Sequence, residues 1–124
     1  MIKRKSNPED NELIAFFQYV RLKESLGDER FGAIWHTENK KKTSFYQGKR
    51  LKAKGQKAGV WDMTVAVPTK NAPGLFIEMK YGSNVLSDSQ IAFGDLMRNM
   101  GYKTHIAYSA NEAITALEVY LKDQ

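Results

Sequence analysis

The sequence predicts an α/β fold in which a mixed sheet is flanked by helices. Four short runs, at 31–36, 61–67, 75–81 and 102–108, alternate apolar side chains in the way that is typical of strands. Three longer runs place apolar residues three or four positions apart, as in helices that pack on a sheet. The order that we predict along the chain is α-β-β-β-α-β-α.

The first helix follows Asn7 and Pro8, which supply a capping side chain and a favourable first position. We predict that it ends near Gly27, and that its buried stripe consists of Leu13, Phe16, Phe17 and Val20. A strand from Phe31 to His36 should follow. A single histidine at a strand end is more often a surface residue than a catalytic one, so we leave His36 out of the catalytic set.

Eight basic residues and no acidic one lie between Glu38 and Asp62, in a segment that we predict as a basic loop over 40–58, with helical character around 49–54. Such a charge block fits a contact surface for a phosphate backbone, but a solvated loop accounts for it as well. The residues that would contact DNA are Lys40, Lys41, Lys42, Lys49, Arg50, Lys52, Lys54 and Lys57.

Two aromatic residues, Phe45 and Tyr46, interrupt the basic block. Aromatic side chains among lysines can stack on exposed bases. They can equally anchor a loop to the core, and composition favours the anchoring interpretation.

The runs 61–67 and 75–81 are predicted to form a hairpin, because Pro68 stops the first and 71–74 has turn composition. Alternation puts Trp61, Met63, Val65 and Val67 on one face of the first strand, with Asp62 on the other. In the second strand Leu75, Ile77, Met79 and Tyr81 share a face, and the opposite face carries Phe76, Glu78 and Lys80.

Three ionisable residues of this hairpin, Asp62, Glu78 and Lys80, would meet across the strand pair. Two carboxylates form a site for a hard divalent cation, and a nearby ammonium can stabilise an anion or orient a water. The alternative makes Asp62 a turn residue, and Glu78 with Lys80 an ion pair on a solvated edge strand. The chain has no cysteine, so oxygen ligation favours Mg²⁺ or Mn²⁺.

The remaining elements are a helix from Ser87 to Gly101, the strand 102–108, and a helix that opens at Ser109 and buries Ile114, Leu117 and Leu121. Ser87 and Gln90 match a capping box, in which the glutamine side chain bonds back to the cap amide. At 124 residues and 42% apolar content, we expect one domain over 1–124. No stretch has the length of a membrane span and no signal peptide precedes it, so we expect a soluble, cytoplasmic protein.

Three motifs together resemble the VRR-NUC (virus-type replication-repair nuclease) family of the PD-(D/E)xK nuclease superfamily. These are Gly59-Val60-Trp61-Asp62, Phe76-Ile77-Glu78-Met79-Lys80, and Leu86-Ser87-Asp88-Ser89-Gln90. The resemblance extends from Glu12 to about Leu121. Trp61 departs from the family, which more often has proline or a small residue before the aspartate.

The resemblance implies a restriction-endonuclease-like sheet and a divalent-metal-dependent deoxyribonuclease. Its catalytic residues would be Asp62, Glu78, Lys80 and Gln90, and its metal ligands Asp62, Glu78, the Met79 carbonyl and Glu12. Without the resemblance, Glu12 is explained by the helix dipole, which favours acidic residues in a first turn. The expected substrate is branched DNA, a Holliday junction or a flap, in replication, recombination or repair.

A homodimer would suit such a two-fold substrate, and no small-molecule cofactor is expected. The family name also suggests a phage or other viral origin. The alternative function is a catalytically inactive DNA-binding scaffold that keeps the nuclease fold.

Overall fold

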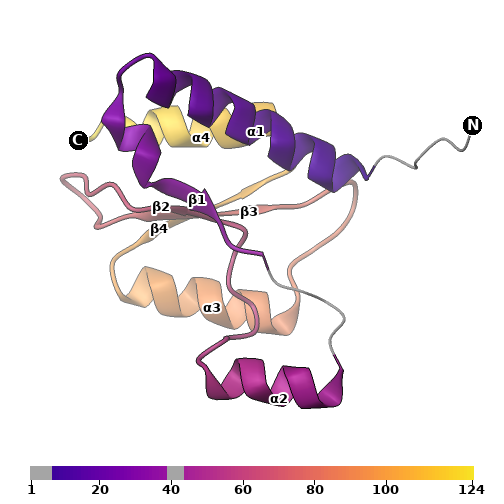
Figure 1. Cartoon of the computed structure of the whole chain (residues 1–124). Helices are drawn as coiled ribbons and strands as arrows, with labels where there is room; N and C mark the ends of the chain where they lie inside the picture. Colours follow the sequence, from indigo (N-terminus) through magenta and orange to yellow (C-terminus); the bar gives the residue numbers. More distant parts are fainter. Residues whose placement is uncertain (1–6, 39–43) are drawn as a thin grey trace, which may run out of the picture.

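The computed structural model describes residues 7–38 and 44–124. The predicted α/β class is confirmed, and the predicted order of elements holds with two additions, η1 and α2. In chain order the elements are α1 (Pro8–Ser25), the 3₁₀ helix η1 (Glu29–Ala33), β1 (Ile34–His36), α2 (Phe45–Ala53), β2 (Met63–Val65), β3 (Leu75–Met79), α3 (Asp88–Asn99), β4 (Lys103–Ala107) and α4 (Ala110–Leu121) (Figure 1).

The four strands form one mixed sheet in the order β1-β2-β3-β4. β2 pairs antiparallel with β1 and with β3, which confirms the predicted hairpin, and β3 pairs parallel with β4. A parallel pair needs a crossover connection, and α3 supplies it. The carboxyl ends of β3 and β4 therefore lie at the same edge of the sheet.

Helices cover both faces of the sheet, with α1 and α4 on one side and α3 on the other (Figure 1). The main core forms on the first side, where Phe16 and Val20 of α1 are buried together with Met63 and Ile77 of the sheet. On the second side the ring of Phe93 packs edge-on against Phe76, with centroids 5.2 Å apart. Apolar burial on both faces makes β2 and β3 the fixed centre of the molecule.

The segment 31–36 is a strand only in its second half, so the prediction of a strand from Phe31 was wrong. Asp28 caps η1: its Oδ1 accepts from the Arg30 amide at 3.2 Å, and its Oδ2 lies 2.8 Å from the Arg30 guanidinium. Phe31 is buried against Tyr19, with ring centroids 5.9 Å apart. Phe31 is therefore buried from a 3₁₀ helix and not from a strand, although the sequence 31–36 alternates.

Helix α2 occupies the middle of the predicted basic loop 40–58. It begins after Ser44, whose hydroxyl accepts from the Gln47 amide at 3.1 Å, and it has no buried residue. Figure 1 shows α2 beyond α3, away from the sheet. Across 7–38 and 44–124, no helix is long and apolar enough to cross a membrane.

Candidate functional site

Asp62 and Glu78 face each other across the β2–β3 pair. The register joins Met63 to Ile77, so one step further along the ladder Asp62 lies opposite Glu78. The Asp62 amide donates to Glu78 Oε1 at 3.0 Å, and the Met79 amide donates to Asp62 Oδ2 at 3.0 Å. Both carboxylates are therefore fixed by backbone amides of the neighbouring strand.

Glu78 shares a face of β3 with Phe76, as the alternation predicted, and α3 covers this face. Glu78 is only 3% exposed, in contrast to most acidic residues. Asp62, in the same cluster, is partly buried. Burying two carboxylates together is unfavourable unless protons, cations or hydrogen-bond donors compensate, which is why such pairs are found at functional sites more often than in ordinary cores.

Gln90, the third residue of α3, links Glu78 to Lys80. Its Nε2 donates to Glu78 Oε2 at 3.0 Å, and its Oε1 accepts from Lys80 Nζ at 2.9 Å. Lys80 Nζ also lies 3.5 Å from Glu78 Oε2. The structure thus brings together all four residues expected at the catalytic site.

The capping box of α3 uses the same glutamine. The Ser87 amide donates to Gln90 Oε1 at 2.9 Å, while the Gln90 amide donates to the Ser87 hydroxyl at 3.3 Å. One oxygen therefore accepts from both the cap amide and Lys80. The helix cap and the contact to Lys80 therefore coexist, and the cap holds the side chain in the orientation that reaches Lys80.

Burial raises the pKa of Glu78 to about 7, and the negative charge of Asp62 contributes to the increase. The pKa of Asp62 is also raised, mainly by burial, although the hydrogen bond from Met79 acts in the opposite direction. Both carboxyls therefore hold protons more tightly than they would in water. A cation bound between them would displace those protons.

The segment Gly59–Trp61 packs against the first turns of α3. The Trp61 indole N–H donates to the Gln90 carbonyl at 2.9 Å, and its ring is 1% exposed. A Cβ on Gly94 would lie 2.7 Å from this ring. At Gly59, where φ is +85°, a Cβ would lie 2.3 Å from the carbonyl oxygen of Ser89. Two glycines thus allow the close approach that sets α3 against Asp62.

Trp61 lies on the α3 side, so its predicted place on the same face as Met63 and Val65 was wrong. β2 begins only at Met63, and the alternation of the strand does not extend back to Trp61. The indole is drawn to α3 because Gly94 leaves space for the ring and the Gln90 carbonyl accepts its N–H.

Glu12, on α1, reaches the start of α4, where its Oε2 accepts from the Ala110 amide at 2.9 Å. This contact caps α4, and an acidic group is favourable at that position. Met79, whose carbonyl was the other predicted ligand, contacts the site through its amide. The metal-binding roles of Glu12 and Met79 remain predictions.

Two residues outside the predicted set also lie near Asp62. His36 Nδ1 is 2.9 Å from the Asp62 carbonyl oxygen, which can only accept, so Nδ1 carries a proton. The charge of His36 lowers the pKa of Asp62 and that of Glu9 raises it, so both lie within electrostatic range. In the sequence, His36 stands out only as a histidine at a strand end, and Glu9 only as an acidic residue in the first turn of a helix. Both features are common away from functional sites.

The pair fits a hard divalent cation in its donor chemistry. Both residues supply carboxylate oxygens, and the Asp62 amide and the Met79 amide hold them side by side. Within the same residues, no group of three or more His, Cys, Asp or Glu side chains could hold a metal ion. Mg²⁺ suits such a site, because it is commonly bound by one or two carboxylates and otherwise by water and substrate phosphates.

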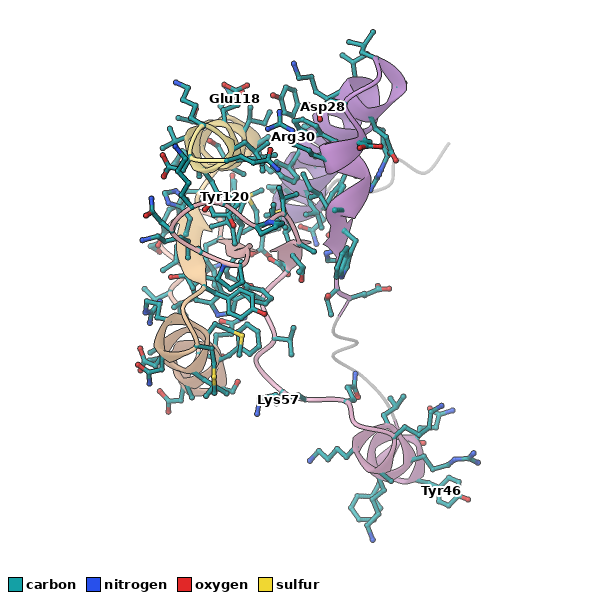
Figure 2. All side chains as sticks on the ribbon, turned by 90° about the vertical axis from the view of Figure 1, so that its left-hand side faces the viewer. Asp28, Arg30, Tyr46, Lys57, Glu118 and Tyr120 are labelled. Carbon is teal, nitrogen blue, oxygen red and sulfur yellow. The ribbon has the colours of Figure 1, made fainter. Side chains whose placement is uncertain are left out.

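Five of the predicted DNA-contacting residues lie on α2 and the segment after it: Lys49, Arg50, Lys52, Lys54 and Lys57. All five are exposed. Figure 2 shows Lys57 on the stretch that leads from α2 back to the sheet. The other three, Lys40, Lys41 and Lys42, lie outside the described residues.

Phe45 and Tyr46 do not anchor α2 to the core, so the favoured interpretation of these two residues was wrong. Phe45 is 82% exposed and Tyr46 is 68% exposed. Figure 2 shows Tyr46 pointing away from the sheet. They occupy the first turn of a helix that buries none of its residues.

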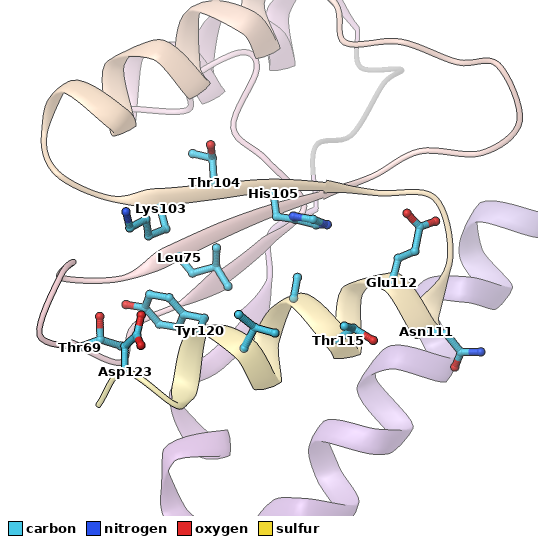
Figure 3. A pocket seen from close by; sticks show the side chains of 12 residues that line it. Thr69, Leu75, Lys103, Thr104, His105, Asn111, Glu112, Thr115, Tyr120 and Asp123 are labelled. Atoms are coloured by element: carbon cyan, nitrogen blue, oxygen red, sulfur yellow. The ribbon is translucent and has the colours of Figure 1, made fainter.

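A cavity of about 610 Å³ lies between β4 and α4 (Figure 3). Leu75 and Tyr120 line its apolar part, and Lys103, His105 and Glu112 contribute polar groups. None of the four predicted catalytic residues lines it. The buried carboxylate pair, rather than this cavity, is therefore the candidate site for chemistry.

The fold is a mixed α/β sheet with helices on both faces. Its two facing acidic residues, Asp62 and Glu78, lie at the end of the central β2–β3 pair. A solved structure described as a VRR_NUC domain protein superimposes with a TM-score of 0.81 at 21% sequence identity, over 97% of this chain and 93% of that one. The predicted resemblance to the VRR-NUC family is thereby confirmed at the level of the fold. No protein-family model and no curated protein sequence matches the chain.

Proposed function

We propose that this chain is a divalent-metal-dependent endonuclease that hydrolyses DNA phosphodiester bonds. The observation that carries the proposal is the buried Asp62–Glu78 pair, to which Gln90 connects Lys80. This arrangement of two acidic residues and a lysine at one end of an adjacent strand pair is the one expected of a PD-(D/E)xK nuclease. The shared fold with a VRR_NUC domain protein supports the same activity.

Asp62 and Glu78 would hold Mg²⁺ or Mn²⁺, with the Met79 carbonyl as a further ligand, whereas Glu12 is engaged at the Ala110 amide. Such an ion supplies charge neutralisation at the scissile phosphate and lowers the pKa of a bound water. The chain's own residues orient the reactants around it. Because both carboxylates accept backbone amides, the site is organised before substrate arrives.

Lys80 would position the attacking water or stabilise charge on the phosphate. Its Nζ is directed by Gln90 Oε1, and the Glu78 carboxylate lies beside it. An ammonium held by one neutral and one acidic acceptor keeps a defined place, although its stem is flexible. Gln90 acts on the reaction through Lys80 and Glu78, so it is a positioning residue.

The basic residues of α2 and the following segment would contact the phosphate backbone. Five exposed cations without an intervening acidic residue provide a strong electrostatic contribution to DNA affinity. We propose branched DNA, a Holliday junction or a flap, as the substrate, and a cytoplasmic homodimer as the active form. A two-fold dimer would match the symmetry of a junction.

A second candidate function is a DNA-binding scaffold without turnover. It is favoured by one observation: both oxygens of Glu78 already have partners in the protein, the Asp62 amide and the Gln90 amide group. A carboxylate satisfied in this way can be structural. The two proposals differ in whether cations bind and bonds break.

Labelled linear duplex, flap and four-way-junction DNA should be incubated with the purified protein in Mg²⁺, in Mn²⁺ or with a chelator. The Asp62→Ala protein, prepared identically, reveals any contaminating nuclease. We expect cutting that requires the cation and is absent from the variant, with the junction or flap cut faster than the duplex. Binding without cutting in either cation would support the scaffold instead.

A further inference from the structure

Helix α2 presents two aromatic side chains to solvent on an otherwise basic surface. Phe45 is 82% exposed and Tyr46 is 68% exposed. Large aromatic groups contribute favourably to stability when they are buried, and these two rings, on a helix without a fully buried residue, make no such contribution. A binding partner that covers them would explain their position.

The surroundings of these rings are cationic. On the helix, Lys49 lies one turn beyond Phe45, and Arg50 lies one turn beyond Tyr46. Lys49 Nζ is 5.2 Å from the centroid of the Phe45 ring, within the range of a cation–π contact. No acidic residue occurs in 44–57. A partner for this surface must therefore be both anionic and able to cover flat aromatic groups.

We infer that α2 is a stacking surface for unpaired DNA bases, with Phe45 and Tyr46 as the stacking residues and its lysines and arginine as backbone contacts. The inference rests on the proposed function for the identity of the nucleic acid. Single-stranded nucleic acid combines a polyanionic backbone with exposed base faces. Fully paired duplex buries those faces between neighbouring base pairs. Unpaired nucleotides, such as those at a branch point, meet both requirements for a partner: they are anionic, and their base faces are free to cover an aromatic ring.

This role makes α2 a determinant of substrate choice for the carboxylate site. The chain runs from α2 through Lys57 (Figure 2) to residues 59–61 and then directly to Asp62. Gly59 and Trp61 are fixed on α3 by the close approaches described above. A base held on α2 would therefore be tied through a short segment to the metal-binding strand.

Binding in a chelator tests the inference without any cleavage. Fluorescence anisotropy should compare a labelled oligothymidylate with a duplex of equal length for the unaltered protein and for the Phe45→Ala/Tyr46→Ala protein. Stacking contributes strongly for each base, so we expect the double variant to bind oligothymidylate about tenfold to a hundredfold more weakly. Affinity for duplex should change by less than about threefold, because cation contacts dominate there.

Further variants separate stacking from other effects. Phe45→Trp should keep the affinity for oligothymidylate, whereas Phe45→Leu, which stays apolar but loses the flat ring, should reduce it. Lys52→Gln should weaken both DNAs and decrease the salt dependence. Leu22→Ala on α1 removes another exposed apolar side chain, 54% exposed, and should change neither affinity. Circular dichroism verifies that each protein is folded.

An equal loss of affinity for both DNAs, or no loss, would overturn the inference. A change of oligomeric state in the double variant, measured by sedimentation, would also overturn it and assign α2 to a protein contact. These results do not depend on cleavage. A protein that stacks on oligothymidylate but never cuts DNA would refute the nuclease proposal and leave the role of α2 intact.

Discussion

Asp62 and Glu78 each accept a hydrogen bond from the backbone of the other's strand. The Asp62 amide reaches Glu78 Oε1 at 3.0 Å, and the Met79 amide, next to Glu78, reaches Asp62 Oδ2 at 3.0 Å. Neither carboxylate can turn away without leaving a backbone amide unpaired, which is costly in a buried environment. The repulsion between them is therefore built into the folded sheet.

This repulsion should make the stability of the metal-free protein depend on pH. The pKa of Glu78 is raised from 4.5 to about 7 on folding, so its protonated form is favoured in the folded state. The resulting stabilisation is fully present below pH 4.5 and is lost as the pH rises through about 7. The pKa of Asp62 is also raised, so its contribution to stability changes with pH in the same direction. The free energy of unfolding should fall by about 3 kcal/mol across this window.

Urea unfolding with a chelator, at several pH values from acidic to mildly alkaline, measures this change. The Glu78→Gln protein cannot ionise at this position, so its unfolding free energy should vary much less with pH. Equal pH dependence in the two proteins would show that Glu78 is not the group responsible. Divalent cations should restore stability at high pH in the unaltered protein, because ligand binding to the folded state alone stabilises it.

Ser87→Ala and Gln90→Ala distinguish the helix cap from the site. Each breaks the capping box of α3, so each should lower the free energy of unfolding by about 1 kcal/mol. Only Gln90→Ala removes the contacts to Glu78 and Lys80, and the rate of cleavage should then fall by about tenfold to a hundredfold. Single-turnover rates and thermal denaturation measure the two effects. If both variants cut at the same rate, Gln90 is only a cap.

Gly59→Ala and Gly55→Ala form a matched pair, because both glycines have positive φ. A Cβ at Gly55 meets nothing within 4 Å, so the alanine should cost only the backbone strain, about 1 kcal/mol. At Gly59 the Cβ would lie 2.3 Å from the Ser89 carbonyl oxygen, which forces α3 away from Trp61. We expect an additional loss of about 2 kcal/mol there, together with slower cleavage. Chemical denaturation of the two variants would reveal equal losses if the contact is unimportant.

The hairpin and its acidic residues could be predicted from sequence because strand alternation alone decides which side chains share a face. Glu78 and Phe76 share one face and Leu75 and Ile77 the other, as expected; the structure shows that the first meets α3 and the second the main core. The capping box at Ser87 was equally evident, since it depends on residues three positions apart. These features are local, and local patterns are what a single sequence records.

The features that could not be predicted depend on contacts between distant segments. Trp61 turns toward α3 because Gly94, far along the chain, leaves room for its ring. Glu12 reaches Ala110, and His36 reaches the Asp62 carbonyl, through tertiary packing that no periodicity records. The exposure of Phe45 was missed because an aromatic residue among lysines can either anchor a loop to the core or point into solvent, and the sequence does not distinguish the two.

The most direct test of the carboxylate site is the single-turnover cleavage rate of branched DNA in Mn²⁺ for Asp62→Asn and Glu78→Gln. Both substitutions keep the size of the side chain and remove its charge. Asp95→Asn is the control, because Asp95 lies on α3 in an exposed ion pair with Arg98. We predict that the first two variants cut at least about a hundredfold more slowly and that the control cuts normally. Cleavage by Asp62→Asn and Glu78→Gln at the rate of the unaltered protein would contradict the assignment of this pair as a metal-binding catalytic site.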